Sequence, residues 1–146
     1  MSEMNLSIFY TDDDVEDQLM FIDAMHEVAK DVKVSTQANG DDLIRLLNSP
    51  PPQPSVIFLD LNMPVKNGFE VLKELRQLKQ FNKVPVVIFT TSDHEAAIET
   101  TRRLGANLYV TKPLTYNLLK GVIRHVLSID WANFTPSDGN FVYRGN

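Results

Sequence analysis

The stretch Val-Ile-Phe-Leu-Asp, residues 56–60, is an uninterrupted apolar run that ends in a carboxylate. Three other stretches have the same form: residues 7–14 end in aspartates, residues 86–92 end in hydroxyl side chains, and residues 108–113 end in lysine and proline. Such runs are typical of strands buried on both faces of a parallel sheet. Because ligands bind beyond the carboxyl ends of these strands, we expect carboxylates, a hydroxyl and one lysine to meet at one edge.

Helical patterns alternate with these strands. Apolar residues recur at helical spacing and form one-sided stripes suited to covering a sheet, in residues 15–25, 41–48, 68–78, 95–104 and 115–127. A shorter and more polar run, residues 32–36, indicates an edge strand. Strand and helix thus alternate five times, and right-handed crossovers predict an α/β fold with a doubly wound, five-stranded parallel sheet.

Composition excludes several classes of function. The net charge of −5 over 146 residues argues against a nucleic-acid partner, whose binding surface is normally basic. The absence of cysteine excludes disulfides and thiolate metal sites. The first residues lack the pattern of a signal peptide, and no apolar stretch is long enough to span a bilayer. We therefore expect a cytoplasmic protein without a membrane partner.

Turn-forming residues separate the predicted elements. Asn67-Gly68 is expected to open the third helix, and Gly105 to end the fourth. The proline-rich residues 50–54 predict a stiff loop, with a polyproline ligand as the alternative. We expect one domain over residues 1–128.

Three acids are the candidate metal ligands. Carboxylates gathered in one pocket repel one another, and Mg²⁺ relieves that repulsion while keeping waters for phosphate oxygens. Asp12, Asp13 and Asp60 follow two of the apolar runs, and Asn62 is placed where its backbone carbonyl could complete the site. Asp14 fits the N-cap of a helix better than the metal site.

Asp60 is the candidate nucleophile, because its strand is the most uniformly apolar and therefore expected to be central. A carboxylate can accept a phosphoryl group as an acyl phosphate if the charge on the transferred oxygens is neutralised. Lys112 could supply a point charge and Thr90 a hydrogen bond. A cis peptide bond before Pro113 could aim Lys112 inward. Hydrolase chemistry based on histidine is not supported, since the histidines lie on or beside predicted helices: His26, His94 and His125.

Four motifs, residues 10–14, 58–64, 88–92 and 110–113, make the chain resemble the receiver domain of two-component response regulators. Their order and spacing match that family over about residues 5–128. The resemblance implies a flavodoxin-like fold with strand order 2-1-3-4-5. One departure is Thr11, where the family often has valine.

The resemblance also implies a role for each site residue. Asp60 would be the phospho-acceptor, and Lys112 would contact the phosphoryl group. The Mg²⁺ ligands would be Asp12, Asp13, Asp60 and the backbone carbonyl of Asn62. Thr90 and Tyr109 would form the switch pair. Gly68 matches the family glycine beyond the acceptor strand. Asn62 and Ser92 lie beside the path of hydrolytic water and are expected to tune the lifetime of the acyl phosphate.

We therefore expect a stand-alone receiver that takes its phosphoryl group from a phosphohistidine on a partner kinase or phosphotransferase. A partner not identified by the sequence would bind the face made by the fourth helix, fifth strand and fifth helix. One alternative is an adaptor with the same fold that works without phosphorylation. A second is an aspartate-based phosphatase, but Asn62 stands where such enzymes have a second acid.

The segment 129–146 has too many aromatic residues for a disordered linker: Trp131, Phe134, Phe141 and Tyr143. Trp131 and Phe134 are three apart, which predicts that they extend the apolar face of the fifth helix by one turn. The extension is too short for an independent domain. The sequence leaves two roles open, packing on its own domain and contact with a partner or a second copy in a homodimer.

Overall fold

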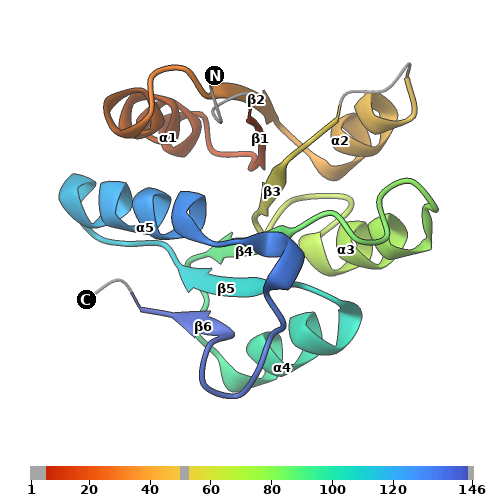
Figure 1. Cartoon of the computed structure of the whole chain (residues 1–146). Coiled ribbons are helices and arrows are strands. Elements are labelled where there is room, and N and C mark those ends of the chain that lie inside the picture. The colour runs from red at the N-terminus through yellow and green to blue at the C-terminus, as the bar shows by residue number, and fades with distance from the viewer. Residues whose placement is uncertain (1–5, 50–52, 145–146) are drawn as a thin grey trace.

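A parallel sheet lies between two layers of helices in the computed structural model, which describes residues 6–49 and 53–144 (Figure 1). The strands are β1 (Ser7–Thr11), β2 (Lys33–Gln37), β3 (Val56–Leu59), β4 (Val86–Thr90), β5 (Leu108–Thr111) and β6 (Val142–Tyr143). The helices are α1 (Val15–Val28), α2 (Gly40–Leu47), α3 (Gly68–Gln77), α4 (Glu95–Leu104) and α5 (Tyr116–Ser128). The strand order is β2-β1-β3-β4-β5-β6, so the predicted order 2-1-3-4-5 is confirmed and a short sixth strand is added at the β5 edge.

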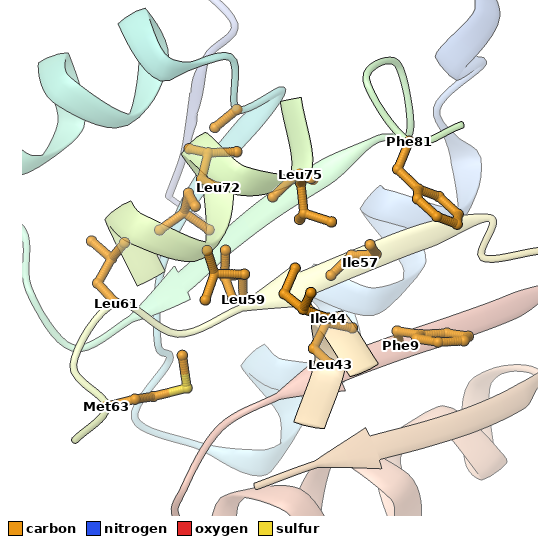
Figure 2. Close-up of a cluster of buried hydrophobic side chains, with 14 of the residues drawn as sticks. Phe9, Leu43, Ile44, Ile57, Leu59, Leu61, Met63, Leu72, Leu75 and Phe81 are labelled. Carbon is orange, nitrogen blue, oxygen red and sulfur yellow. The ribbon is translucent and has the colours of Figure 1, made fainter. Parts of the chain in front are cut away.

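The central strands are apolar throughout because both of their faces are covered. Side chains of β3 alternate between two cores: Ile57 and Leu59 belong to one cluster, and Val56 and Phe58 to the other. The first cluster, part of which is drawn in Figure 2, packs under α2, α3 and α4. The second packs under α1 and α5. This two-sided burial explains the uninterrupted apolar runs.

The register of the sheet brings the carboxyl ends of four strands to one edge. Thr11 of β1 pairs with Leu59 of β3, and Thr90 of β4 pairs with Thr111 of β5. The next residue along each of these strands therefore leaves the sheet at the same edge. The polar residues predicted to meet there do so because of this register.

Helix starts follow the capping residues that the sequence provides. The Asp14 side chain accepts a hydrogen bond from the Asp17 N–H, which confirms its predicted capping role. Asn67 and Glu70 form a reciprocal capping box at the start of α3, with hydrogen bonds of 3.0 and 2.9 Å. At its far end, α4 stops at Gly105, whose φ of 107° suits glycine.

A strained turn follows β3. Val65 has a φ of 69° and is 96% exposed, and the Lys66 N–H donates to the Pro64 carbonyl at 2.8 Å. Three-residue turns with positive φ are rare and strained, and a β-branched side chain fits them poorly. The side chain of Val65 is too exposed for its packing to offset this strain.

We therefore expect Val65→Asn to raise the free energy of unfolding by about 1 kcal/mol, because asparagine tolerates positive φ. Urea denaturation measures the change. Val15→Asn is the control, since Val15 is also exposed but lies in an ordinary helical turn. The strain assignment is wrong if Val65→Asn gives no gain over the wild-type protein.

The predicted extension of α5 by Trp131 and Phe134 is wrong. The helix ends at Ser128, Ile129 has an extended backbone, and a separate turn of 3₁₀-helix covers Trp131–Asn133. The rings of Trp131 and Phe134 meet edge to face at 5.2 Å and pack against the cluster under α1 and α5. Both aromatics therefore cover the domain's own core without prolonging the helix.

The rest of the C-terminal segment lies along β5. The Phe141 ring is 2% exposed and packs beside Tyr109, with ring centroids 6.3 Å apart. The Tyr109 N–H donates to the Phe141 carbonyl at 2.8 Å, and the β6 strand that follows is parallel to β5. Of the two roles left open by the sequence, the structure shows packing on the same domain.

Side chains tie this segment to the helices on either side of β5. Arg102 of α4 pairs with Asp138 at 2.6 Å, and the ring of His125 in α5 stacks on Tyr143 at 3.8 Å. The segment thus contacts α4, β5 and α5 together. A homodimer stays a prediction.

Some expectations fall outside what the structure covers. Residues 50–52 of the proline-rich stretch lie outside the described residues, so its predicted stiffness stays a prediction. Within 6–49 and 53–144, no helix is long and apolar enough to cross a membrane.

Candidate functional site

Three carboxylates meet at the carboxyl edge of the sheet. Asp12 follows β1 and Asp60 follows β3, and both side chains are buried, whereas Asp13 is exposed. One oxygen from each of the three lies within 4.8 Å of the others. The structure thus brings together the three acids that the sequence singled out, in a group that could hold a divalent cation.

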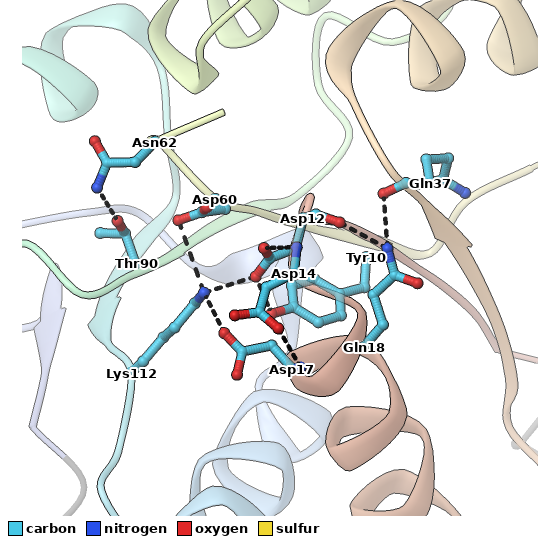
Figure 3. Close-up of polar contacts among 10 residues, drawn as sticks. All are labelled: Tyr10, Asp12, Asp14, Asp17, Gln18, Gln37, Asp60, Asn62, Thr90 and Lys112. Carbon is cyan, nitrogen blue, oxygen red and sulfur yellow. Dashed lines mark hydrogen bonds and ion pairs between the residues drawn. The ribbon is translucent and has the colours of Figure 1, made fainter. Parts of the chain in front are cut away.

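Asp12 is held by its protein neighbours (Figure 3). Its Oδ1 accepts the Asp14 N–H at 2.9 Å, and its Oδ2 accepts the Tyr10 hydroxyl at 2.5 Å and Lys112 Nζ at 2.6 Å. Burial, with the charge of Asp12, raises the pKa of Tyr10, so its hydroxyl stays protonated and donates. Sequence reasoning missed Tyr10; the signal was a tyrosine inside an apolar strand, whose hydroxyl needs a partner.

Asp13 differs from Asp12 in having no such partners. Across the described part of the chain, neither oxygen of Asp13 takes part in a hydrogen bond or an ion pair with another side chain. A cation could therefore bind Asp13 without breaking a contact that stabilises the fold.

Ionisation of the buried Asp60 side chain costs free energy in the folded protein. Burial raises its pKa from 3.8 to about 6; the charge of Lys112 opposes this shift and the charge of Asp12 adds to it. The folded protein therefore holds the Asp60 proton more tightly than the unfolded chain does. It follows that the contribution of Asp60 to stability falls as the pH rises from about 4 to about 6, and stays at the lower level above that.

Consequently, Asp60→Asn is expected to stabilise the metal-free protein at pH 7.5 by roughly 2 to 3 kcal/mol. At pH 3.5 the gain should vanish, because Asp60 is then neutral in the folded state and largely neutral in the unfolded chain. Denaturant titrations in EDTA at the two pH values measure this difference. An equal gain at both values would mean that the ionisation of Asp60 is not its cause.

Lys112 reaches three carboxylates at once. Its Nζ lies 2.6 Å from Asp12, 2.7 Å from Asp17 and 4.0 Å from Asp60. Burial alone would lower the pKa of Lys112, but hydrogen bonds to Asp12 and Asp17 outweigh it and leave the pKa above its ordinary value. The peptide bond to Pro113 is trans, so a cis bond does not aim this side chain. Asp17 was not found from the sequence.

Of the expected switch residues, Thr90 lies on β4, the neighbour of β3, and Tyr109 lies on β5, one strand further from Asp60. Asn62 Nδ2 donates to Thr90 Oγ1 at 3.4 Å, and the buried Tyr109 hydroxyl donates to the Ser92 carbonyl at 2.8 Å. The loop after β4 is therefore joined to β5 through Tyr109. The roles expected for Asn62, Thr90, Tyr109 and Ser92 stay predictions.

Gly68 allows the β3–α3 loop to pack closely against the backbone of Asp60 and Leu61. A Cβ on Gly68 would lie 2.4 Å from the Asp60 carbonyl oxygen and 2.8 Å from Leu61 Cα. Both are backbone atoms, so no side chain can move aside to make room. Glycine at this position thus lets the start of α3 approach the backbone of Asp60.

A comparison with known protein families gives a result that agrees with this fold and with the grouped acids. The family model for the response regulator receiver domain matches residues 10–124, which is most of the chain. The protein therefore belongs to the response regulator receiver domain family, a family of signalling proteins.

Individual relatives support the assignment. The chain is 44% identical to response regulator Rcp1 of Synechocystis sp. over 61 residues, which are 42% of each protein. It is 34% identical to protein PilH of Pseudomonas aeruginosa over 90 residues, 62% of this chain and 73% of PilH. The chain spans about half the length of other curated relatives that it matches, 42% of Rcp1 and 55% of the chemotaxis protein CheY homolog of Campylobacter jejuni.

Two solved structures have the same fold. The Mn²⁺-bound form of Rcp1 superposes with a TM-score of 0.74 at 28% identity, covering 90% of this chain and 99% of Rcp1. The phosphorylated cyanobacterial phytochrome response regulator RcpA gives a TM-score of 0.80 at 26% identity, covering 90% of this chain and 97% of RcpA.

Proposed function

We propose that the protein is a single-domain response regulator that accepts a phosphoryl group on Asp60 in a Mg²⁺-dependent reaction. The donor is a phosphohistidine on a partner histidine kinase or phosphotransferase in the cytoplasm. The position of Asp60 is the observation that carries this proposal. Its carboxylate lies at the end of the central strand, with acids on one side and Lys112 Nζ 4.0 Å away.

The donor atoms at this edge fit a Mg²⁺ ion. Only oxygen ligands are offered, and the ligand set proposed is Asp12, Asp13, Asp60 and the backbone carbonyl of Asn62. Both oxygens of Asp12 already have protein partners, so Asp13 and Asp60 are proposed to be the main ligands of the ion. When bound, the ion neutralises charge on the transferred phosphoryl oxygens. The Mn²⁺ bound to Rcp1 supports a divalent cation in this fold.

The transfer needs little from the protein beyond position and charge. An Asp60 oxygen attacks phosphorus, the P–N bond of the phosphohistidine breaks, and a P–O bond forms. The electron pair of the broken bond returns to the ring nitrogen, and because the other ring nitrogen of the phosphohistidine carries a proton, the imidazole leaves as a neutral ring. Lys112 then faces the phosphoryl oxygens, and the Thr90 hydroxyl can donate to one of them. The solved structure of RcpA is that of a phosphorylated response regulator, which supports this chemistry in the fold.

The output is proposed to pass through Thr90 and Tyr109 to the α4–β5–α5 face. Tyr109 is buried here with its hydroxyl on the Ser92 carbonyl, and this packing is one of the two proposed. When Thr90 turns towards the phosphoryl group, the space it frees favours this buried packing and shifts the population towards it. The C-terminal segment contacts this face through Phe141, which packs beside Tyr109, and through Asp138, which pairs with Arg102 of α4. The surface that an output partner meets therefore includes this segment.

Asn62 and Ser92 are proposed to set the lifetime of the acyl phosphate. Both are small and polar, and they flank the path of hydrolytic water, so self-dephosphorylation is expected. Asn62 Nδ2 is also bonded to Thr90, which links the lifetime to the switch.

Two alternatives are distinguished by experiment. An adaptor that works without phosphorylation would not need a complete acid set with a lysine, and a phosphatase would need a second acid where Asn62 stands.

Incubation with the histidine kinases of the host, each autophosphorylated with labelled ATP, tests the proposal. We expect label to move to this protein from one or a few kinases and none to reach Asp60→Asn. Transfer from no kinase, or equal label in the mutant, would contradict it.

A further inference from the structure

Lys112 is engaged by a carboxylate that belongs neither to the metal group nor to the acceptor. Its Nζ contacts Asp17 at 2.7 Å, closer than the 4.0 Å that separates it from Asp60. We propose that Asp17 is a positioning residue that holds Lys112 towards α1 and thereby restrains phosphorylation at Asp60. This inference rests on the proposed function, because it assumes that Lys112 meets a phosphoryl group on Asp60.

Asp17 and Asp60 compete for the same positively charged group, the ammonium of Lys112. Figure 3 shows the lysine amine between Asp60 on one side and Asp17 on the other. Lys112 is 13% exposed and Asp17 33%, so solvent screens this pair only in part. Contact with phosphoryl oxygens on Asp60 requires the amine to shift away from α1, which weakens its bond to Asp17.

The charge of Asp17 acts in the same direction. An incoming phosphoryl donor is negatively charged and approaches an edge that already holds Asp12, Asp13 and Asp60. A further carboxylate beside the single lysine offsets the charge that would attract the donor. Both effects are removed when Asp17 is made neutral.

Asp17 can be replaced without disturbing the helix that carries it. Its backbone N–H, not its side chain, is the group that Asp14 caps, and the side chain's one partner among the described residues is Lys112. Glu16 lies in the same turn of α1, is exposed, and forms no ion pair within the described part of the chain. The two substitutions Asp17→Asn and Glu16→Gln therefore remove equal charge and a similar helix-dipole interaction.

The test compares wild type, Asp17→Asn, Glu16→Gln and Asp17→Glu. Two quantities are measured at fixed Mg²⁺: the rate of phosphorylation by acetyl phosphate, and the affinity for beryllofluoride, a phosphoryl mimic that needs no transfer. Asp17→Asn should raise both by roughly threefold to tenfold, the effect of losing one partly buried ion pair. Glu16→Gln should change neither by as much, and Asp17→Glu should stay near wild type.

The pairing is also checked without any phosphoryl group. The side-chain amine resonance of Lys112, followed by NMR in the metal-free protein, should shift in Asp17→Asn and not in Glu16→Gln. An unshifted resonance would overturn the inference.

The remaining outcomes separate this inference from the proposed function. A fall in rate and affinity in Asp17→Asn would mean that Asp17 holds Lys112 towards Asp60. An increase no larger than that of Glu16→Gln would mean that the loss of one negative charge, and not the Asp17–Lys112 pair, causes the effect. Either result overturns the inference while leaving phosphorylation at Asp60 intact. If the wild-type protein takes up neither phosphoryl group nor mimic, the proposed function itself has failed.

Discussion

Replacing Asp13 by alanine is expected to abolish Mg²⁺ binding and to slow phosphorylation by at least about 100-fold, because the transferred charge is then no longer neutralised. Asp13 is the acid whose oxygens have no protein partner among the described residues, so a cation depends on it most. Calorimetric titration measures Mg²⁺ binding, and the rate of phosphorylation by acetyl phosphate measures the second effect.

The matched control is Asp14→Asn, which removes one negative charge from the neighbouring residue and keeps the helix cap. It should bind Mg²⁺ and accept phosphate nearly as wild type does. Because the clustered carboxylates repel one another, Asp13→Ala should be at least as stable as wild type without metal. The metal assignment is wrong if Asp13→Ala is phosphorylated at the wild-type rate in Mg²⁺.

Phe141→Ala is expected to lower the free energy of unfolding by about 3 to 5 kcal/mol, because it removes a large buried ring from the core under α4. The loss should also loosen β6, because the Phe141 ring packs the residue just before that strand against Tyr109 of β5. Urea denaturation gives the change. Gly139→Ala is the control in the same segment, since a Cβ at Gly139 has no atom within 4 Å.

Truncation after Ser128 extends this test to the whole C-terminal segment. We expect a large loss of stability with an unchanged oligomeric state in solution, which follows from packing on the same domain. A fall from dimer to monomer on truncation would instead favour an interface between two copies. No change in stability or in oligomeric state would contradict both roles.

The strands and the site edge were predictable because each depends on a local pattern. Burial on both faces leaves an uninterrupted apolar run such as residues 56–59, and the residue that follows it must emerge at the edge. Asp12, Asp13 and Asp60 could thus be placed together without knowing any side-chain contact. The helix caps at Asp14 and Asn67 were equally local.

The partners of the site residues were not predictable in the same way. Asp17 lies in a helix turn where acids are common, and only the packing of α1 beside α5 brings it to Lys112, which lies between β5 and α5. The C-terminal segment also departed from its helical spacing. Ile129 leaves the helix in an extended conformation. Trp131 and Phe134 then pack on each other and on the core under α1 and α5, while Phe141 packs beside Tyr109.

Formation of one acyl phosphate on Asp60 is the step on which every other proposed role depends. Intact-mass spectrometry after incubation with Mg²⁺ and phosphoramidate, a small P–N donor that imitates phosphohistidine, tests it most directly. We predict that the mass rises by one phosphoryl group, that EDTA prevents the rise, and that Asp60→Asn shows none. Unchanged labelling of Asp60→Asn, or no labelling of the wild-type protein, would contradict this prediction.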